Sequence, residues 1–267
     1  MVIGAGAAGA AAAAALAPAV SVALIDRVAE PGWRIGETLP GAARRVLARI
    51  GAWERFAAAG HAAAPLKVSR WGSDEAVALD AFRDPDGVGW RLDRACFETD
   101  LRTNAVVRGA TLIAPATVDA VTRTAKGWTV SLAGGEVLQA LQIIDAGGRR
   151  SRLLRPFGQR RMVMDRLACA HQRVRQRGAA DPSTYTEATA DGWCTQPRCG
   201  TDGGSSPFMA TAISPLSAAS CAQGRSRRRS AFPALRPRSE TLTRWMRQRR
   251  SYAPRTALPG AQPGTAG

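Results

Sequence analysis

The chain is short of several residue types, and each shortage limits what the protein can be. Only two of its 37 basic residues are lysines, and its 267 residues include two histidines and five cysteines. No C-x-x-C pair occurs, Cys194 and Cys199 have no histidine beside them, and His61 and His171 stand alone. These absences argue against a disulfide-rich secreted domain and against a zinc site. We therefore expect no metal, and a reducing, cytoplasmic location.

Long uninterrupted hydrophobic runs are also missing. The alanine-rich start of the chain, residues 2–25, is interrupted by Gly4, Gly6 and Gly9, and no basic region precedes it. A signal peptide would need the basic region, and a membrane span would need a longer apolar run. We therefore expect a soluble protein that makes no membrane contact.

Acidic residues are scarce toward the C-terminus. Residues 1–193 hold 25 basic and 19 acidic side chains, whereas residues 194–267 hold 12 arginines against Asp202 and Glu240. The formal net charge of +16 suggests a nucleic-acid partner, but most of the excess lies where the hydrophobic periodicity also fails. We predict an irregular basic tail over 194–267, disordered or read in a shifted frame of a GC-rich gene, which leaves nucleic acid disfavoured as a partner. The alternative is a basic arm that binds nucleic acid through these arginines.

The pattern of residues 1–193 predicts an α/β fold. The start reads as a short strand, a turn over Gly4–Gly9, a helix over Ala10–Leu16 and a strand over Val20–Ile25. Further helices are expected at Pro40–Ile50, Ala52–Ala59, Arg94–Val107 and Ser151–Phe157. Further strands are expected at Leu66–Trp71, Ala76–Phe82, Thr111–Ala114, Val118–Thr124, Trp128–Leu132, Val137–Ile144, Met162–Arg175 and Ser183–Ala190.

The segment Gly4–Gly9 is a G-x-G-x-x-G pattern between a predicted strand and a predicted helix. In this context the first glycine permits a tight turn, the second lets a pyrophosphate approach, and the third allows close packing of helix and strand. Asp26, 22 residues after Gly4 at the end of the second strand, can accept hydrogen bonds from a ribose diol. The pattern predicts a dinucleotide site without a 2′-phosphate; the alternative is a plain tight turn in an alanine-rich helix.

Four segments in this order resemble the FAD-dependent monooxygenase superfamily of the p-hydroxybenzoate hydroxylase type. Within it they are most similar to the branch of flavin-dependent halogenases, geranylgeranyl reductases and halogenase-like peptide-modifying hydroxylases. The segments are Gly4–Gly9 with Asp26, Arg34-Ile35-Gly36-Glu37-Thr38-Leu39-Pro40, Leu92-Asp93-Arg94-Ala95-Cys96-Phe97 followed by Leu101, and Ile144-Asp145-Ala146-Gly147-Gly148-Arg149-Arg150-Ser151.

The resemblance implies the architecture and the cofactor. It implies an FAD/NAD(P)-binding, Rossmann-like parallel sheet with a β-meander crossover over 1–193. A mixed β-sheet substrate region would be interleaved with it, at about 60–92 and 160–193. The insertion of about 80 residues before the meander is too long for a simple nicotinamide-binding half, which also favours FAD.

The resemblance also implies which residues contact FAD. It places Glu37 beside the flavin, brings Arg94 to the phosphates and gives Asp145 a place on the cofactor side. The alternatives are an ordinary loop acid, a solvated first-turn arginine and a cap of the turn, respectively. The full predicted set is Gly4, Gly6, Ala8, Gly9, Asp26, Arg27, Glu37, Arg94, Asp145 and Gly148. No catalytic side chain is predicted, because the cofactor carries the chemistry.

The activity implied is that of an FAD-dependent monooxygenase, acting through a flavin hydroperoxide on an organic or aromatic small molecule or a peptide side chain. NAD(P)H or a separate flavin reductase would supply electrons. The alternatives are a geranylgeranyl-type reductase, a halogenase and, from another class, a basic nucleic-acid-binding module. Lys67 lies where halogenases place a catalytic lysine, but their G-W-x-W-x-I-P signature is missing. The superfamily's later G-D-A-x-H-x-x-x-P segment is missing too, so we expect a truncated chain that binds FAD weakly or not at all.

Overall fold

A computed structural model describes most of the first 215 residues of the chain. The described residues all belong to the first of two compact units, Met1–Pro215. They are residues 1–34, 38–73, 75–160, 162–163, 167–175, 183–189, 192–197 and 207–215.

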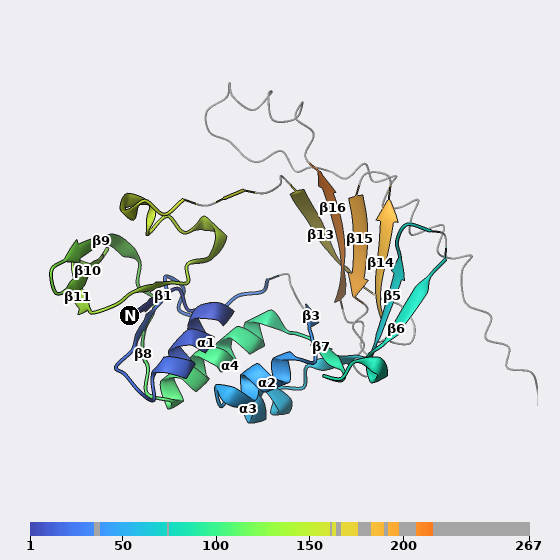
Figure 1. Cartoon of the computed structure of the whole chain (residues 1–267), viewed down its shortest axis with the longest axis horizontal. Helices are drawn as coiled ribbons and strands as arrows, with labels where there is room; N and C mark the ends of the chain where they lie inside the picture. The colour runs from blue at the N-terminus through green and yellow to red at the C-terminus, as the bar shows by residue number, and fades with distance from the viewer. Residues whose placement is uncertain are drawn as a thin grey trace, which may run out of the picture. The chain divides into compact units, whose positions relative to one another are not determined.

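A four-stranded parallel sheet forms the centre of the N-terminal part (Figure 1). Its order is β12-β1-β2-β8, so the first strand lies between two later ones. Register pairs Val2 with Leu24 and with Ile144. Two successive residues of β1 point to opposite faces, as strand geometry requires. The strands are β1 (Val2–Ile3), β2 (Ala23–Ile25), β8 (Thr111–Ile113) and β12 (Ile144–Asp145).

Two helices cover one face of this sheet. Helix α1 (Ala7–Leu16) and helix α4 (Arg94–Val107) lie side by side (Figure 1). The alanines of α1 explain the closeness, because Ala10, Ala13 and Ala14 are fully buried and carry no bulk. They pack with Val2 and Leu24 of the sheet and with an apolar stripe of α4. That stripe consists of Phe97, Leu101 and Ala105, spaced four residues apart on one helix face.

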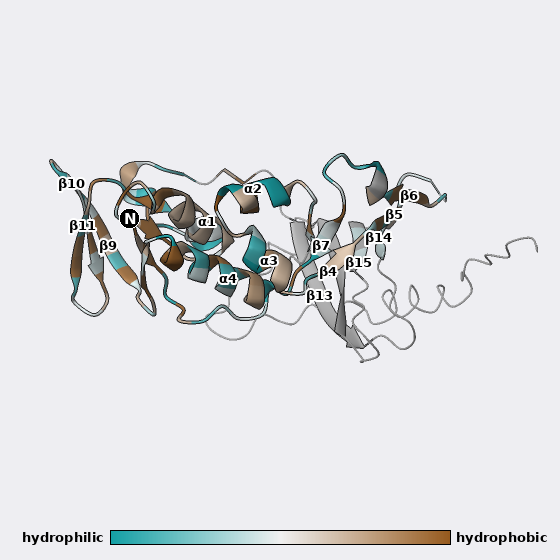
Figure 2. Ribbon diagram, turned by 90° about the horizontal axis from the view of Figure 1, so that it is seen from below, coloured by the Kyte–Doolittle hydropathy of each residue, from teal (hydrophilic) through white to brown (hydrophobic). Residues whose placement is uncertain are grey.

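A β-meander covers the opposite face. It is antiparallel, in the order β11-β10-β9, and Figure 2 shows alternating hydrophilic and hydrophobic bands along β9. Val130 and Leu132 of β10 pack with Ile3 and Ile25, the residues of β1 and β2 that point away from the helices. The meander strands are β9 (Val118–Thr124), β10 (Gly127–Leu132) and β11 (Val137–Ala140).

The insertion between β2 and α4 contributes helices and further sheets. Helix α3 (Trp53–Ala58) packs on α4 through an aromatic cluster in which Phe56 lies between Trp53, Trp90 and Phe97. Helix α2 (Ala43–Arg49) packs against α3. A small sheet has the order β3-β7-β4. Its strands are β3 (Thr38–Leu39), β4 (Ala62–Ala64) and β7 (Gly89–Arg91).

A six-stranded mixed sheet combines strands from two distant parts of the chain. Its order is β13-β16-β15-β14-β5-β6, and β14 pairs with β5 in parallel while the other pairs are antiparallel. The strands are β5 (Leu66–Arg70), β6 (Val77–Asp80), β13 (Leu167–Arg175), β14 (Ser183–Thr189), β15 (Gly192–Pro197) and β16 (Pro207–Pro215). Short 3-10 helices lie at Ala81–Arg83 (η1), Gly148–Arg150 (η2) and Arg155–Phe157 (η3).

The predicted fold class is confirmed, with local corrections. The strand expected over Val137–Ile144 is divided into β11 and β12, because the chain leaves the meander there and enters the parallel sheet. The helix expected over Ser151–Phe157 is only a 3-10 turn, η3, which ends at a left-handed Gly158.

The tail prediction also needs a local correction. Residues 194–197 and 207–215 lie in strands β15 and β16 rather than in an irregular segment. Strand β16 pairs along its whole length with β13, so its backbone hydrogen bonds depend on a distant partner that no local pattern reveals. The rest of the tail lies outside the described residues, and the division into 1–193 and 194–267 stays a prediction. In the described part, no helix is long and apolar enough to cross a membrane.

Candidate functional site: a glycine loop between two parallel strands

The glycine loop follows β1 and turns sharply into α1. Gly4 has φ +103°, a left-handed conformation that favours glycine, and its N–H donates to the Ile25 carbonyl oxygen of β2 at 2.7 Å. A Cβ atom at Gly4 would lie 2.5 Å from the backbone oxygen of Ala146. The loop is therefore pressed between the ends of β2 and β12.

The space beside Gly9 is filled by the chain, whereas the space beside Gly6 is open. A Cβ atom at Gly9 would lie 1.7 Å from the Gly4 carbonyl oxygen, so only glycine allows this contact between helix and loop. No atom of the described chain lies within 4 Å of the place that a Cβ atom of Gly6 would take. Gly6 is also the N-cap of α1, where no side chain caps the helix and the first turn holds no acidic residue. Gly6 thus leaves open space at the first turn of α1, whose N–H groups have no capping side chain, and a helix N-terminus of this kind can bind an anion.

Asp26 lies at the end of β2 beside this loop. Its backbone is held on both sides, because its N–H donates to Ile113 and its carbonyl accepts from Ala116. Its carboxylate is engaged as well: Ala5 N–H donates to Oδ2 at 2.6 Å and Val28 N–H donates to Oδ1 at 2.8 Å. The side chain is 12% exposed. The carboxylate therefore joins the glycine loop to the turn that follows β2.

Arg102 completes this junction from helix α4. Its Nη2 lies 3.2 Å from Asp26 Oδ2 in an ion pair. Its Nε donates to the Ala5 carbonyl oxygen at 2.8 Å, and its Nη1 donates to the carbonyl oxygens of Val28 at 2.8 Å and Ala29 at 3.1 Å. Arg102 is only 3% exposed. One buried cation therefore holds the loop, the turn and the carboxylate together.

Sequence reasoning missed Arg102. A signal existed, because Arg94, Glu98 and Arg102 are spaced four residues apart and share one face of a helix that is otherwise apolar on its buried side. Charged side chains repeated on a buried face indicate partners within the protein, since unpaired buried charges are costly. A cavity of about 490 Å³ opens beside Arg102, between α4 and Ala29–Pro31.

Glu98 is the middle member of this charged face and is 1% exposed. It forms an ion pair with Arg94 one turn earlier, and Arg34 Nη1 approaches its Oε2 at 3.7 Å. Arg94, the predicted phosphate ligand, is therefore held against α4 by a buried carboxylate. Its contact with a cofactor remains a prediction.

Part of the chain matches a known protein family, and its fold matches solved structures. Residues 75–196 match the family model described as tryptophan halogenase. The myxobacterial chondrochloren halogenase CndH, a variant of the FAD-dependent halogenases, is 24% identical with a TM-score of 0.71. The chain has the fold of the FAD-dependent halogenases. This finding confirms the resemblance to the halogenase branch that the sequence predicted.

Two further solved structures have a similar fold. The flavin-dependent halogenase CmlS is 22% identical with a TM-score of 0.74, and the peptidyl tryptophan dihydroxylase QhpG is 19% identical with a TM-score of 0.61. The alignments cover 92%, 93% and 94% of this chain but only 56%, 46% and 50% of CndH, CmlS and QhpG. The chain thus spans about half the length of these halogenase-fold proteins. Among curated proteins, no match was found.

The remaining predicted site residues are Asp145, Gly148, Ala8, Arg27 and Glu37. Asp145 ends β12, beside β1, but its carboxylate accepts from Gly147 N–H at 3.0 Å and from Ser151 Oγ at 2.7 Å. It thus caps its own turn, while its cofactor-side position remains a prediction, and Gly148 begins η2 there with φ +75°. Ala8 and Arg27 are exposed. Glu37 lies outside the described residues, so its flavin-side position stays a prediction.

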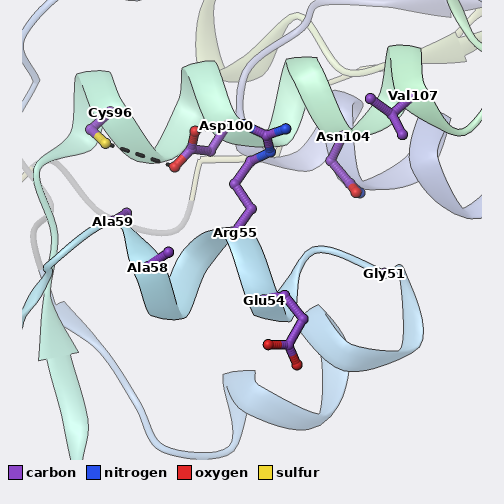
Figure 3. A pocket seen from close by; sticks show the side chains of 9 residues that line it. All are labelled: Gly51, Glu54, Arg55, Ala58, Ala59, Cys96, Asp100, Asn104 and Val107. Carbon is purple, nitrogen blue, oxygen red and sulfur yellow. Dashed lines mark hydrogen bonds and ion pairs between the residues drawn. The ribbon is translucent and has the colours of Figure 1, made fainter.

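A second, larger cavity lies on the other side of α4 (Figure 3). It has a volume of about 580 Å³, and Figure 3 shows Cys96 and Asp100 of α4 facing α3 across it, with Arg55 reaching toward Asp100. Burial and the nearby Asp100 and Asp93 raise the pKa of the Cys96 thiol, which keeps it protonated. None of the predicted site residues lines this cavity. Among the described residues, no group of three metal-ligating side chains occurs.

Proposed function

We propose that this chain contains the FAD-binding part of an FAD-dependent oxidoreductase that acts as a monooxygenase. The observation that carries the proposal is the open side of Gly6, which lies at the bare N-terminus of α1 and next to the carboxylate of Asp26. The cradle fits a dinucleotide, because it combines an anion site with a hydrogen-bond acceptor for a ribose. The halogenase fold supports FAD over NAD as that dinucleotide.

Each group of the cradle has a separate task. The N–H groups at the start of α1 would bind the diphosphate, Asp26 would orient the ribose, and Arg94 would neutralise phosphate charge once it turns from Glu98. FAD, when bound, supplies the redox chemistry that activates dioxygen. The protein residues described here bind and orient the cofactor.

The test is a titration with ADP and FAD of the full chain and of Asp26→Asn. We expect saturable binding of both nucleotides, and a loss of more than about tenfold in affinity in the variant, since a charged acceptor is removed. Asp86→Asn is the matched control, because Asp86 pairs with Arg45 on an exposed surface. Absence of ADP and FAD binding to the unaltered chain would reject the proposed function.

A halogenase is the second candidate, favoured by the match of residues 75–196 to tryptophan halogenases. Lys67 is exposed in the middle of β5, paired with Thr184 of β14, and is available to a substrate. The test supplies FAD, a flavin reductase with NADH, bromide and an electron-rich aromatic compound, and detects the brominated product by mass. Lys67→Met should abolish bromination. Lys126→Met, which alters the other lysine in the chain, should not.

We propose the remaining assignments on the resemblance and the composition. Electrons would come from NAD(P)H, directly or through a separate reductase, and the substrate would be a small molecule or a peptide side chain. The small number of cysteines supports a cytoplasmic location.

A further inference from the structure

The two carboxylate oxygens of Glu98 have unequal surroundings. Glu98 is 1% exposed, and its Oε1 accepts a hydrogen bond from Nη2 of Arg94. Its Oε2 is buried too, but it has no hydrogen-bond partner among the described residues. Nη1 of Arg34 lies 3.7 Å from Oε2, which is close enough for an ion pair and too far for a hydrogen bond. One oxygen is therefore satisfied, while the other is held only by a more distant charge.

Two arginines thus share one carboxylate, which leaves one positive charge in excess. They come from different elements, because Arg94 lies in the first turn of α4 and Arg34 lies between β2 and β3. The side chain of Arg94 is 20% exposed and that of Arg34 is 48% exposed. Either guanidinium can therefore reach an anion in solvent, whereas the carboxylate of Glu98 cannot follow it.

Arg94 cannot leave Glu98 unless another cation replaces it. A buried carboxylate without a partner is costly, and removing one member of a buried ion pair destabilises a protein strongly. Arg34 is placed for this replacement, because its Nη1 needs to approach Oε2 by less than about 1 Å to reach hydrogen-bonding distance. Its half-exposed side chain is free of the packing that would oppose such a movement.

We propose that Arg34 takes the place of Arg94 on Glu98 when Arg94 turns to a phosphate group of the nucleotide. Glu98 and Arg34 are then positioning residues, since they act on the ligand only through Arg94. The inference rests on the proposed function for its ligand, because it assumes a nucleotide phosphate near Arg94. The exchange of partners at Glu98 is a property of the chain itself and can be measured without the nucleotide.

The first experiment titrates ADP into the full chain, Arg34→Met, Glu98→Gln and the double variant by calorimetry. Arg34→Met should weaken ADP binding about fivefold, because Arg94 must then leave a buried charge without a replacement. In the Glu98→Gln background the same substitution should cost less than about twofold, since no buried charge remains. Arg45→Met is the matched control, because it removes an arginine from an exposed ion pair with Asp86. The control should also cost less than about twofold.

Two outcomes of this titration would overturn the proposal. Equal losses from Arg34→Met in the two backgrounds would mean that Arg34 contacts the nucleotide itself. No loss in the unaltered background would mean that Arg94 needs no replacement on Glu98. Failure of the unaltered chain to bind ADP would instead reject the proposed function, and the second experiment then decides whether the exchange occurs.

The second experiment measures urea unfolding without any nucleotide. Arg34→Met should lower the urea midpoint by less than about 0.5 M in the unaltered chain, where Arg94 still holds Glu98. In Arg94→Met it should lower the midpoint by more than about 1 M, because the buried carboxylate then loses both arginines. A double variant that does not fold would be the extreme form of this result. Equal shifts in the two backgrounds would contradict an exchange at Glu98.

Discussion

Gly6 and Gly9 are three residues apart in one turn of chain, yet a methyl group at each would meet opposite surroundings. At Gly9 it would overlap the Gly4 carbonyl oxygen at 1.7 Å, whereas at Gly6 it would enter space that no described atom occupies within 4 Å. Gly9 therefore serves packing. Gly6 is left for a ligand, and its φ of −69° is one that alanine adopts without strain.

This contrast gives a prediction for two alanine variants. Gly9→Ala should lower the free energy of unfolding by about 3 kcal/mol, because helix and loop must separate. Gly6→Ala should change that free energy by less than about 0.5 kcal/mol, while the affinity for ADP falls by more than about tenfold. Urea unfolding and ADP titration measure the two effects. Equal stability losses in the two variants would contradict the assignment.

Helix α4 is the element that connects the two cavities and the glycine loop. Its start is set by Asp93, whose Oδ1 accepts from the N–H groups of Ala95 at 2.9 Å and Cys96 at 3.0 Å. Any loosening of this end would move Arg94 and Glu98, which follow directly in the first turns. The cap thus has consequences for the site as well as for the helix.

Removing this cap should cost stability in a predictable way. Asp93→Ala should lower the free energy of unfolding by about 1 kcal/mol, because two N–H groups lose their acceptor. Asp93→Asn is the matched control and should lose much less, since asparagine caps helices about as well as aspartate. Urea unfolding of the three proteins at neutral pH makes the comparison. A loss in the asparagine variant as large as in the alanine variant would argue against a capping role.

The same end of α4 carries a pH-sensitive contact. His61 Nδ1 accepts from Asp93 N–H at 3.3 Å, and its ring lies against Phe56 and Phe97. Its Nε2 is buried and has no hydrogen-bond partner among the described residues. Burial lowers the pKa of His61 below its ordinary 6.5, and the charges of Asp100 and Asp93 oppose this only in part. The folded chain therefore holds this histidine neutral at a pH where the unfolded chain protonates it.

It follows that acid should weaken the fold through His61. As the pH falls from 6.5 toward the lowered pKa, the unfolded state binds a proton that the folded state does not, so the contribution of His61 is lost. His61→Phe keeps the ring packing but cannot titrate. The free energy of unfolding of the wild type minus that of the variant should be lower at about pH 5 than at about pH 8 in denaturant unfolding. A difference that does not change with pH would contradict this account.

At the scale of the whole molecule, the described contacts favour one half of the cofactor. The glycine loop and Asp26 would contact the diphosphate and the adenosine ribose, while Glu37, the residue predicted beside the flavin, lies outside the described part. The binding free energy that these described groups supply should therefore come from the ADP half.

This leads to a prediction about FAD itself. The affinity for FAD should exceed that for ADP by less than about tenfold, because the described cradle contacts only the ADP half of the cofactor. The purified chain should then be colourless. An absorbance scan and parallel titrations with FAD and ADP measure this. Protein that purifies yellow with near-stoichiometric flavin would contradict weak binding, while it would support the proposed cofactor.

Much of the N-terminal architecture could be read from the sequence. Local signals predicted α4 over Arg94–Val107 and β9 over Val118–Thr124, with the bounds that the structure shows. The glycine pattern predicted the loop, and the four motifs predicted the halogenase fold. These features depend on neighbours in the chain, so a local pattern contains the information that determines them.

The interactions within the site depended on residues far apart. That Arg102 would bind Ala5 and Asp26, across 97 and 76 positions of sequence, follows only when α4 lies beside the glycine loop. The same holds for β16, which pairs with β13. The sequence by itself determined where a nucleotide cradle would lie and which fold would carry it. The tertiary structure alone decided that Ala5, Val28 and Arg102 would engage the Asp26 carboxylate, because a carboxylate is bound by whichever donors and cations the packing brings to it.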